Sequence, residues 1–155
     1  MHQRNIHRDG YDMQQLSATF PGLKEFLTVN PAGKETIDFA DNKAVLALNS
    51  ALLAHYHGVS NWNIPDGYLC PPVPGRADYL HHLADLMARD NRDTLTHGPL
   101  IEVLDIGVGA GSIFPILGNN SYGWSFVGSD IDEVAIANAR SICEGNETLS
   151  EHVKL

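Results

Sequence analysis

The segment LIEVLDIGVGAGS, residues 100–112, constrains the fold of this chain more than any other stretch. Its apolar run, which ends in an acid, predicts a buried parallel strand, and the glycines that follow predict a tight loop into a helix. Glycines allow sharp backbone turns and let a ligand approach the backbone closely. The amide groups that open the next helix favour negative or polar ligand groups. The segment therefore predicts an α/β fold that binds a nucleotide-type cofactor at this loop.

The glycine spacing in the loop distinguishes between two classes of cofactor. A nicotinamide or flavin site requires G-x-G-x-x-G, whose third glycine packs the helix on the strand. Here Gly107, Gly109 and Gly111 follow G-x-G-x-G, and Ser112 occupies the position of the third dinucleotide glycine. Asp105 at the strand end would face a diphosphate unfavourably, whereas it suits a cationic ligand. S-adenosylmethionine carries a sulfonium and an ammonium and no phosphate, so the sequence favours this cofactor.

A second motif follows the glycine loop. The segment GWSFVGSDID, residues 123–132, predicts another strand that ends in Asp130. At the tip of a second strand, a carboxylate can accept hydrogen bonds from both ribose hydroxyls of an adenosine. Asp132 predicts the N-cap of a helix over 133–143, and the terminal EHVKL predicts the start of a third strand. Together the motifs predict the first part of a Rossmann-like class I methyltransferase domain over 98–155.

Residues 1–97 predict a mainly helical region in front of this incomplete domain. The first ten residues, polar and basic, predict a flexible arm. Caps and periodicity predict helices over 13–19, 21–28 and 42–56, with a turn at 30–33 and an extended piece at 36–39. The prolines between residues 61 and 75 predict an extended connector, because proline excludes a helix interior. An amphipathic helix is expected to begin near Arg76.

Composition limits the remaining classes of function. The formal net charge of −9 on 155 residues disfavours a nucleic-acid binder. Two scattered cysteines, Cys70 and Cys143, are too few for a disulfide framework or a zinc knuckle, and they fit a reduced, cytoplasmic protein. The polar N-terminus and the lack of a long apolar run argue against export and against a membrane partner.

Histidines and aromatic residues invite two further hypotheses. The eight histidines include close pairs, but none has a cysteine or an acid at ligand spacing, so we expect no metal. Trp62, Tyr68 and Trp124 are candidates for stacking on bases. Aromatic residues beside prolines and strands more often belong to the core, and we favour that interpretation.

Four segments, in this order along the chain, resemble the bacterial 23S ribosomal RNA adenine-N6 methyltransferase family. They are NPAGKETIDFAD (30–41), GYLCPPVPGRADYLHHLADL (67–86), LDIGVGAGSIFPILG (104–118) and GWSFVGSDID (123–132). The resemblance implies an enzyme that transfers a methyl group from S-adenosylmethionine to the N6 amine of one adenine. It implies 23S ribosomal RNA, or a large-subunit assembly intermediate, as the substrate and partner.

The resemblance also implies roles for individual residues. Arg76 matches an arginine that reaches the carboxylate end of the cofactor. The residues that match the cofactor loop and the ribose-binding acid are Asp105, Gly107, Gly109, Gly111 and Asp130. The N-terminal portion of such enzymes helps to hold RNA, which gives Arg4, Arg8 and Lys34 phosphate-contacting roles.

One expected catalytic element has no counterpart in the chain. Enzymes of this type use an Asn-Pro-Pro-aromatic tetrapeptide that binds the adenine amine and stacks on the flipped-out base. The nearest sequence, CPPV at 70–73, has neither a carboxamide nor an aromatic ring, and we interpret it as a rigid spacer that sets Arg76. We expect the catalytic residues beyond Leu155, in a longer protein. The alternatives are a non-catalytic S-adenosylmethionine- or RNA-binding module and a nucleotide-cofactor oxidoreductase.

Overall fold

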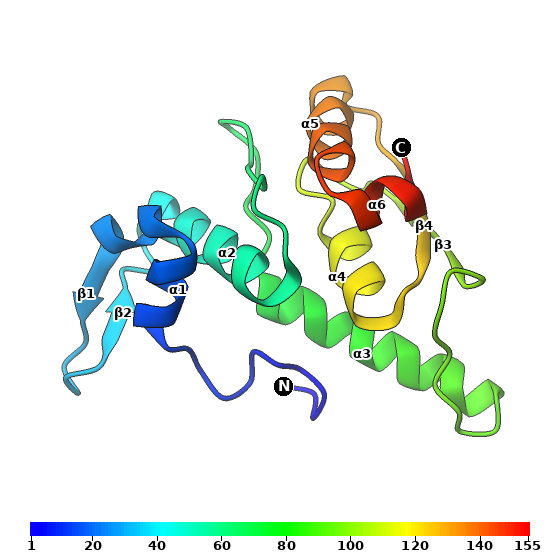
Figure 1. Cartoon of the computed structure of the whole chain (residues 1–155), viewed down its shortest axis with the longest axis horizontal. Helices are drawn as coiled ribbons and strands as arrows, with labels where there is room; N and C mark the ends of the chain where they lie inside the picture. Colours follow the sequence, from blue (N-terminus) through cyan, green and yellow to red (C-terminus); the bar gives the residue numbers. More distant parts are fainter.

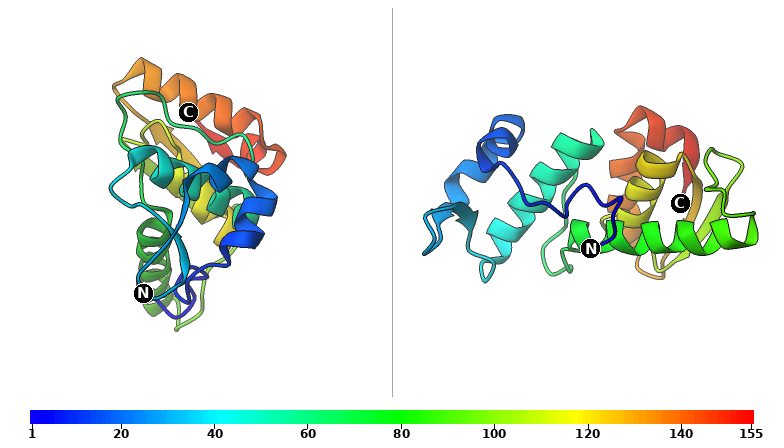
Figure 2. Two further views of the ribbon diagram at one scale, coloured as in Figure 1. Left: turned by 90° about the vertical axis from the view of Figure 1, so that its left-hand side faces the viewer. Right: turned by 90° about the horizontal axis from the view of Figure 1, so that it is seen from below.

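A long helix, α3 (Val73–Asp90), joins the two parts of the fold in the computed structural model, which describes all residues from 1 to 155. Figure 1 shows the elements that precede α3 on one side and those that follow it on the other. The second view in Figure 2 shows α3 running beneath the C-terminal elements. One continuous cluster of buried apolar side chains includes residues from both parts. The predicted boundary near residue 97 falls in the loop after α3.

The N-terminal part contains a small hairpin that the sequence did not predict. Its elements are α1 (Met13–Thr19), the 3-10 helix η1 (Pro21–Phe26), β1 (Leu27–Val29), β2 (Glu35–Ile37) and α2 (Asn42–His57). The predicted helix over 21–28 is wrong in its last residues, because the chain becomes extended at Leu27 and pairs antiparallel with β2. The turn between the strands is held by Asn30, whose side-chain oxygen accepts from the amides of Ala32 and Lys34.

The predicted helix ends are mostly confirmed. Asp12, Asp41 and Asp132 accept hydrogen bonds from the first helical amides of the helices that follow them, and Gly58 ends α2 with a φ of 69°. The predicted start of α3 at Arg76 is three residues late, because proline suits the first turn of a helix and Pro74 lies in that turn. No helix is long and apolar enough to cross a membrane.

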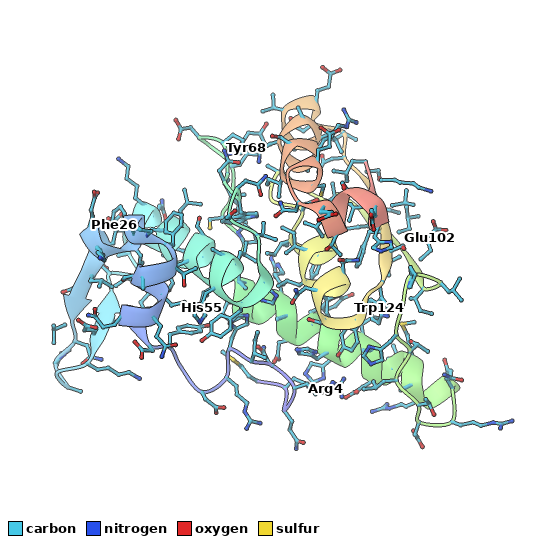
Figure 3. The ribbon with its side chains drawn as sticks, in the orientation of Figure 1. Arg4, Phe26, His55, Tyr68, Glu102 and Trp124 are labelled. Carbon is cyan, nitrogen blue, oxygen red and sulfur yellow. The ribbon has the colours of Figure 1, made fainter.

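The C-terminal part is built on a parallel sheet in the order β3-β4-β5. Its strands are β3 (Glu102–Ile106), β4 (Ser125–Ser129) and β5 (Val153–Lys154), and its helices are α4 (Ile113–Tyr122), α5 (Glu133–Glu144) and α6 (Glu147–His152). The third strand predicted at the end of the chain is thus confirmed. Helix α4 contacts both β4 and α3, and Trp124, labelled in Figure 3, is fully buried beside them.

Strand β3 is parallel as predicted, but it is not buried. It pairs with β4 along one edge only, and the side chains of Leu104 and Ile106 are 63% and 80% exposed. An apolar run reports the hydropathy of the side chains and not the number of neighbouring strands. The prediction of burial was therefore wrong, although the strand itself and its direction were predicted correctly.

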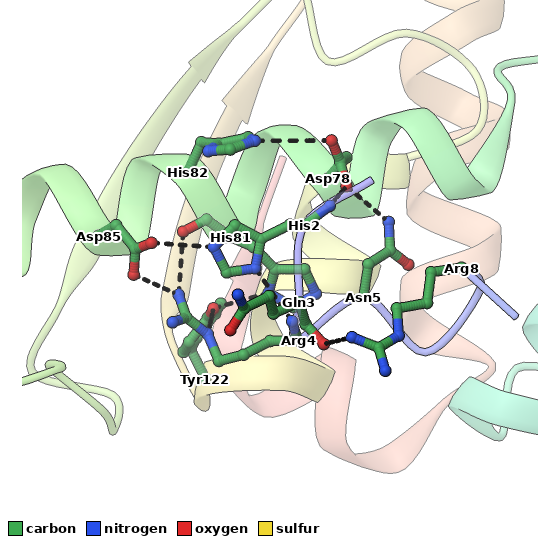
Figure 4. A network of polar contacts seen from close by, with 10 residues as sticks. All are labelled: His2, Gln3, Arg4, Asn5, Arg8, Asp78, His81, His82, Asp85 and Tyr122. Atoms are coloured by element: carbon green, nitrogen blue, oxygen red, sulfur yellow. Dashed lines mark hydrogen bonds and ion pairs between the residues drawn. The ribbon is translucent and has the colours of Figure 1, made fainter.

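The N-terminal arm, residues 2–8, lies against α3 and is not the flexible segment that its composition predicts (Figure 4). Asp78 and Asp85 lie two turns apart on one face of α3, and both carboxylates bind side chains of the arm. The side chain of Arg4 contacts Asp85 at 2.6 Å, and the imidazole of His2 contacts the same carboxylate at 2.9 Å. Asn5 is buried and donates to Asp78 at 3.1 Å. The arm is ordered by its charge complementarity with α3. The composition of the arm alone does not reveal these contacts.

Three buried histidines lie where the arm meets the helices. The Nε2 atoms of His7 and His57 are 3.2 Å apart, and Nδ1 of His57 is 2.8 Å from Oδ1 of Asn120. Burial, together with the neighbouring His57, lowers the pKa of His7 to about 4. Burial likewise lowers the pKa of His81 to about 4, while its Nδ1 lies 2.7 Å from the hydroxyl of Tyr122.

These histidines make the fold sensitive to acid. The folded pKa of His7 lies below the ordinary value of 6.5, so the unfolded state takes up the proton first and stability falls as pH decreases from 6.5 to about 4. We expect His7 and His81 each to lower the free energy of unfolding by about 2 kcal/mol at about pH 5 relative to neutral pH. Urea unfolding at the two pH values measures this loss.

Two variants test the origin of that pH dependence. His7→Asn removes one of the titrating groups, so its stability should depend less on pH, even where it is lower overall. His97→Asn changes an exposed histidine whose side chain makes no hydrogen bond or ion pair, and it should keep the pH dependence of the parent chain. Equal pH dependence in the parent and His7→Asn would contradict the assignment.

Candidate cofactor site

The two predicted motifs meet at the carboxyl ends of β3 and β4. The amides of Gly107 and Val108 both donate to the carbonyl oxygen of Ser129, at 2.8 and 2.9 Å. Gly107 and Gly109 have φ values of 81° and 67°, in the left-handed region where a side chain is disfavoured. These two glycines let the chain fold back from the end of β3 onto the tip of β4.

Asp130 connects the glycine loop to the turn before α5. Its Oδ2 accepts from the amide of Gly109 at 3.0 Å, and its Oδ1 accepts from the amide of Asp132 at 3.1 Å. A carboxylate oxygen can accept more than one hydrogen bond. Asp130 is only half-buried, so both oxygens can also accept from a ligand hydroxyl. The position is that expected for an acid that binds a ribose diol.

Asp105 lies near the carboxyl end of β3 and adds a second carboxyl group to this site. Its Oδ2 is buried and has no hydrogen-bond partner, and burial raises the pKa of the carboxyl, with a further rise from the charge of Asp130. A buried carboxylate without a partner is unfavourable, and a nearby positive charge relieves the cost. The geometry therefore suits the ammonium and sulfonium of S-adenosylmethionine and disfavours a diphosphate.

Arg76 reaches the same region from α3. Its guanidinium carbon lies 5.8 Å from the ring centre of Phe114, in the first turn of the helix after the glycine loop. The side chain makes no hydrogen bond or ion pair within the chain, so it is available to a carboxylate. The start of α3 is fixed by Asn49, which accepts from the amide of Val73 at 3.1 Å and donates to the sulfur of Cys70 at 3.4 Å. These contacts support the interpretation of CPPV as a spacer.

The connector over 61–70, which we call the strap, covers the glycine loop. The indole N–H of Trp62 donates to the carbonyl oxygen of Gly111 at 2.8 Å. A Cβ atom at Gly111 would lie 2.9 Å from the Cδ1 of Ile64 and 3.2 Å from the indole of Trp62, so the glycine allows the strap to pack this closely on the loop. Sequence reasoning missed the strap as part of the site, and the only signal was a tryptophan next to a proline-rich stretch.

Ser112 is a second feature that the sequence did not reveal. It has a φ of 48° and is fully buried, although left-handed backbone is rare for residues other than glycine, asparagine and aspartate. The thiol of Cys143 on α5 lies 3.5 Å from its hydroxyl. Burial raises the pKa of this thiol.

The structure contains no group of three or more metal-ligating side chains.

The three basic residues expected to contact RNA lie outside the cofactor site. Arg4 is engaged by Asp85 and Tyr122, at 2.6 and 3.2 Å. Arg8 is exposed and contacts only its neighbour and the carbonyl oxygen of Gln3. Lys34 is exposed in the turn before β2, and its Nζ lies close to Gly10. The fold thus brings Lys34 toward the end of the arm that carries Arg8.

The C-terminal part has a Rossmann-like methyltransferase fold. A glycine loop follows β3, and Asp130, which binds this loop, follows β4. Similar solved structures support this fold assignment. The N-terminal domain of human METTL16 in complex with SAH matches with a TM-score of 0.83 and 34% identity, over 99% of this chain and 58% of that one. The hMettl16 catalytic domain in complex with MAT2A 3′UTR hairpin 1 matches with a TM-score of 0.84 and 34% identity, over 99% of this chain and 50% of that one.

Sequence comparisons assign the chain to a particular family of methyltransferases. A family profile described as RNA methyltransferase matches residues 1–155, so the chain belongs to this family. The ribosomal RNA large subunit methyltransferase F of Desulfotalea psychrophila is 56% identical over all 155 residues, which make up 50% of that protein. The protein of the same name from Cytophaga hutchinsonii is 51% identical over 155 residues, 48% of its length. The chain spans about half the length of these curated relatives.

Proposed function

We propose that this chain binds S-adenosylmethionine and forms the cofactor-binding part of an enzyme that methylates the N6 amine of an adenine in 23S ribosomal RNA. The bacterial relatives named for ribosomal RNA methylation, and the human structures bound to SAH and to an RNA hairpin, support this proposal. The chain contains no Asn-Pro-Pro-aromatic sequence. We therefore assign no catalytic residue within it.

The hydrogen bond from Gly109 to Asp130 is the observation that carries the proposal. It joins the glycine loop and the acid of the second strand into one site. When bound, the cofactor supplies an electrophilic methyl group on its sulfonium. Asp130 would hold the ribose hydroxyls, the half-buried Asp105 would face the cationic end, and Arg76 would bind the carboxylate. The close approach at Gly107, Gly109 and Gly111 would let the adenosine lie on the backbone.

Substrate binding belongs to the same proposal. The net charge of −9 opposes general attraction to RNA, so phosphate contacts need a local basic surface. Arg8 and the neighbouring Lys34 are exposed, and they suit this role better than Arg4, whose guanidinium already binds Asp85. Because the proposed substrate is 23S ribosomal RNA or a large-subunit assembly intermediate, we propose that the reaction takes place in the bacterial cytoplasm.

Calorimetric titration of the chain with S-adenosylhomocysteine, beside a titration with NADH, tests the cofactor assignment. We expect saturable binding of S-adenosylhomocysteine and none of NADH. Binding of NADH alone would establish an oxidoreductase-type site in its place. Transfer of labelled methyl from S-adenosylmethionine to 23S ribosomal RNA then separates two outcomes. Cofactor binding without transfer favours a non-catalytic module or catalysis by residues outside this chain, and transfer by the chain itself would overturn our assignment of no catalytic residue.

A further inference from the structure

The strap is tied to the cofactor site at three separate points. The first is the hydrogen bond of Trp62 to the glycine loop. The second is Asn138 of α5, whose side-chain amide donates to the carbonyl oxygens of Asn63 and Ala110, at 3.1 and 2.9 Å. The third is Tyr68, whose hydroxyl donates to Oδ2 of Asp132 at 2.7 Å. Figure 3 shows Tyr68 on the strap beside the N-terminal end of α5.

The bond from Tyr68 fixes the turn that carries Asp130. Oδ1 of Asp132 already accepts from the amides of Val134 and Ala135, at 2.9 and 3.1 Å, so Tyr68 binds the one oxygen that the helix cap leaves free. The backbone amide of Asp132 donates in turn to Oδ1 of Asp130. The hydrogen bond from Tyr68 is also the main cause that lowers the pKa of the Asp132 carboxyl. A continuous chain of contacts therefore runs from the strap to the acid.

The outer half of the strap has little other support. A groove of about 480 Å³ lies between residues 64–70 and the first turns of α2. Leu69 next to Tyr68 is 84% exposed, so it does not anchor this stretch. Trp62 and Asn138 hold only the inner half of the strap. Loss of the Tyr68 hydroxyl should therefore release the turn at 130–132 while the strap stays on the glycine loop.

We propose that Tyr68 is a positioning residue for cofactor binding, which acts through Asp132 to hold Asp130 in the orientation that receives the ribose. This inference rests on the proposed function of Asp130. Tyr68 itself needs no contact with the cofactor. Its effect should pass entirely through Asp130 and leave the binding of Trp62 to the glycine loop unchanged.

Amide hydrogen exchange on the cofactor-free chain tests the first half of the inference. In Tyr68→Phe, the amides of Asp132 and Gly109, both of which donate to Asp130, should exchange about threefold to tenfold faster than in the parent chain. Tyr11→Phe is the matched control, because it removes a hydroxyl that makes no hydrogen bond from a ring that packs beside His7 and Tyr56. Unchanged exchange at both amides in Tyr68→Phe would overturn the inference, whether or not the chain binds a cofactor.

A double-mutant cycle tests the second half. Tyr68→Phe should weaken the binding of S-adenosylhomocysteine about threefold to tenfold in the parent chain and have no effect in an Asp130→Ala background. Equal weakening in both backgrounds would mean that Tyr68 only supports the strap, and it would overturn the positioning role. Failure of the parent chain to bind S-adenosylhomocysteine would refute the proposed function, and the exchange result would still decide whether Tyr68 orders the turn.

Discussion

Asp130→Ala is expected to weaken the binding of S-adenosylhomocysteine by at least about a hundredfold. Hydrogen bonds to a charged acceptor contribute about 1.5–3 kcal/mol each, and this carboxylate is placed to accept two from the ribose. The substitution also frees the amides of Gly109 and Asp132, which loosens the glycine loop. Calorimetric titration of the variant beside the parent chain measures the difference in Kd.

Two further variants separate the role of the charge from a general effect on the fold. Asp130→Asn keeps one acceptor oxygen and should bind roughly tenfold more weakly than the parent chain, because a neutral acceptor binds hydroxyls less strongly. Asp90→Ala removes an exposed carboxylate at the far end of α3 and should bind normally. Parent-like affinity in Asp130→Ala, with its circular dichroism unchanged, would exclude Asp130 from the cofactor site.

Trp124→Ala is expected to lower the free energy of unfolding by about 3–5 kcal/mol, the usual cost of truncating a large buried aromatic residue. Trp124 is fully buried, and its ring stacks on Tyr122 with centroids 4.7 Å apart. Its indole N–H donates to the carbonyl oxygen of Thr96 at 3.0 Å, which fixes the loop between α3 and β3. Urea unfolding followed by far-ultraviolet circular dichroism measures the loss.

Trp124→Phe provides a graded control. It keeps the stacked ring but loses the bond to Thr96, so it should cost about 1–2 kcal/mol. The burial of Trp124 and Trp62 bears out the core interpretation of these two residues, whereas it is wrong for Tyr68, which is half-buried on the strap and not part of the core. A Trp124→Ala chain that keeps its stability, and loses only RNA binding, would contradict this conclusion.

The cofactor loop could be predicted from sequence because its determinants are local. The positive φ values of Gly107 and Gly109 follow from one short stretch, and so does the cap that Asp132 supplies to α5. The meeting of Asp105 and Asp130 follows from a general rule, since the carboxyl ends of adjacent parallel strands share one edge of a sheet. The burial of Oδ2 of Asp105 and the raised pKa of this carboxyl could be seen only in the three-dimensional structure.

The errors of prediction concern contacts between distant parts of the chain. The arm looked flexible because its composition is polar, yet Asp78 and Asp85, more than seventy residues away, neutralise and hold it. Leu27 and Thr28, the first two residues of β1, were assigned to a helix, but their pairing with β2 outweighs local propensity. β3 was expected to be buried because hydropathy does not report which edges of a sheet are paired.

The sequence by itself determined the strand, loop and helix of the cofactor site and the resemblance to an RNA methyltransferase family, and it predicted a cationic cofactor. These depend on residue type and spacing within short segments. Only the tertiary structure decided that the strap covers Gly111, that Tyr68 reaches Asp132 and that His7 is buried against His57. Each of these contacts joins residues 49 or more positions apart in the sequence. Their geometry depends on how the helices pack, and no local pattern in the sequence encodes it.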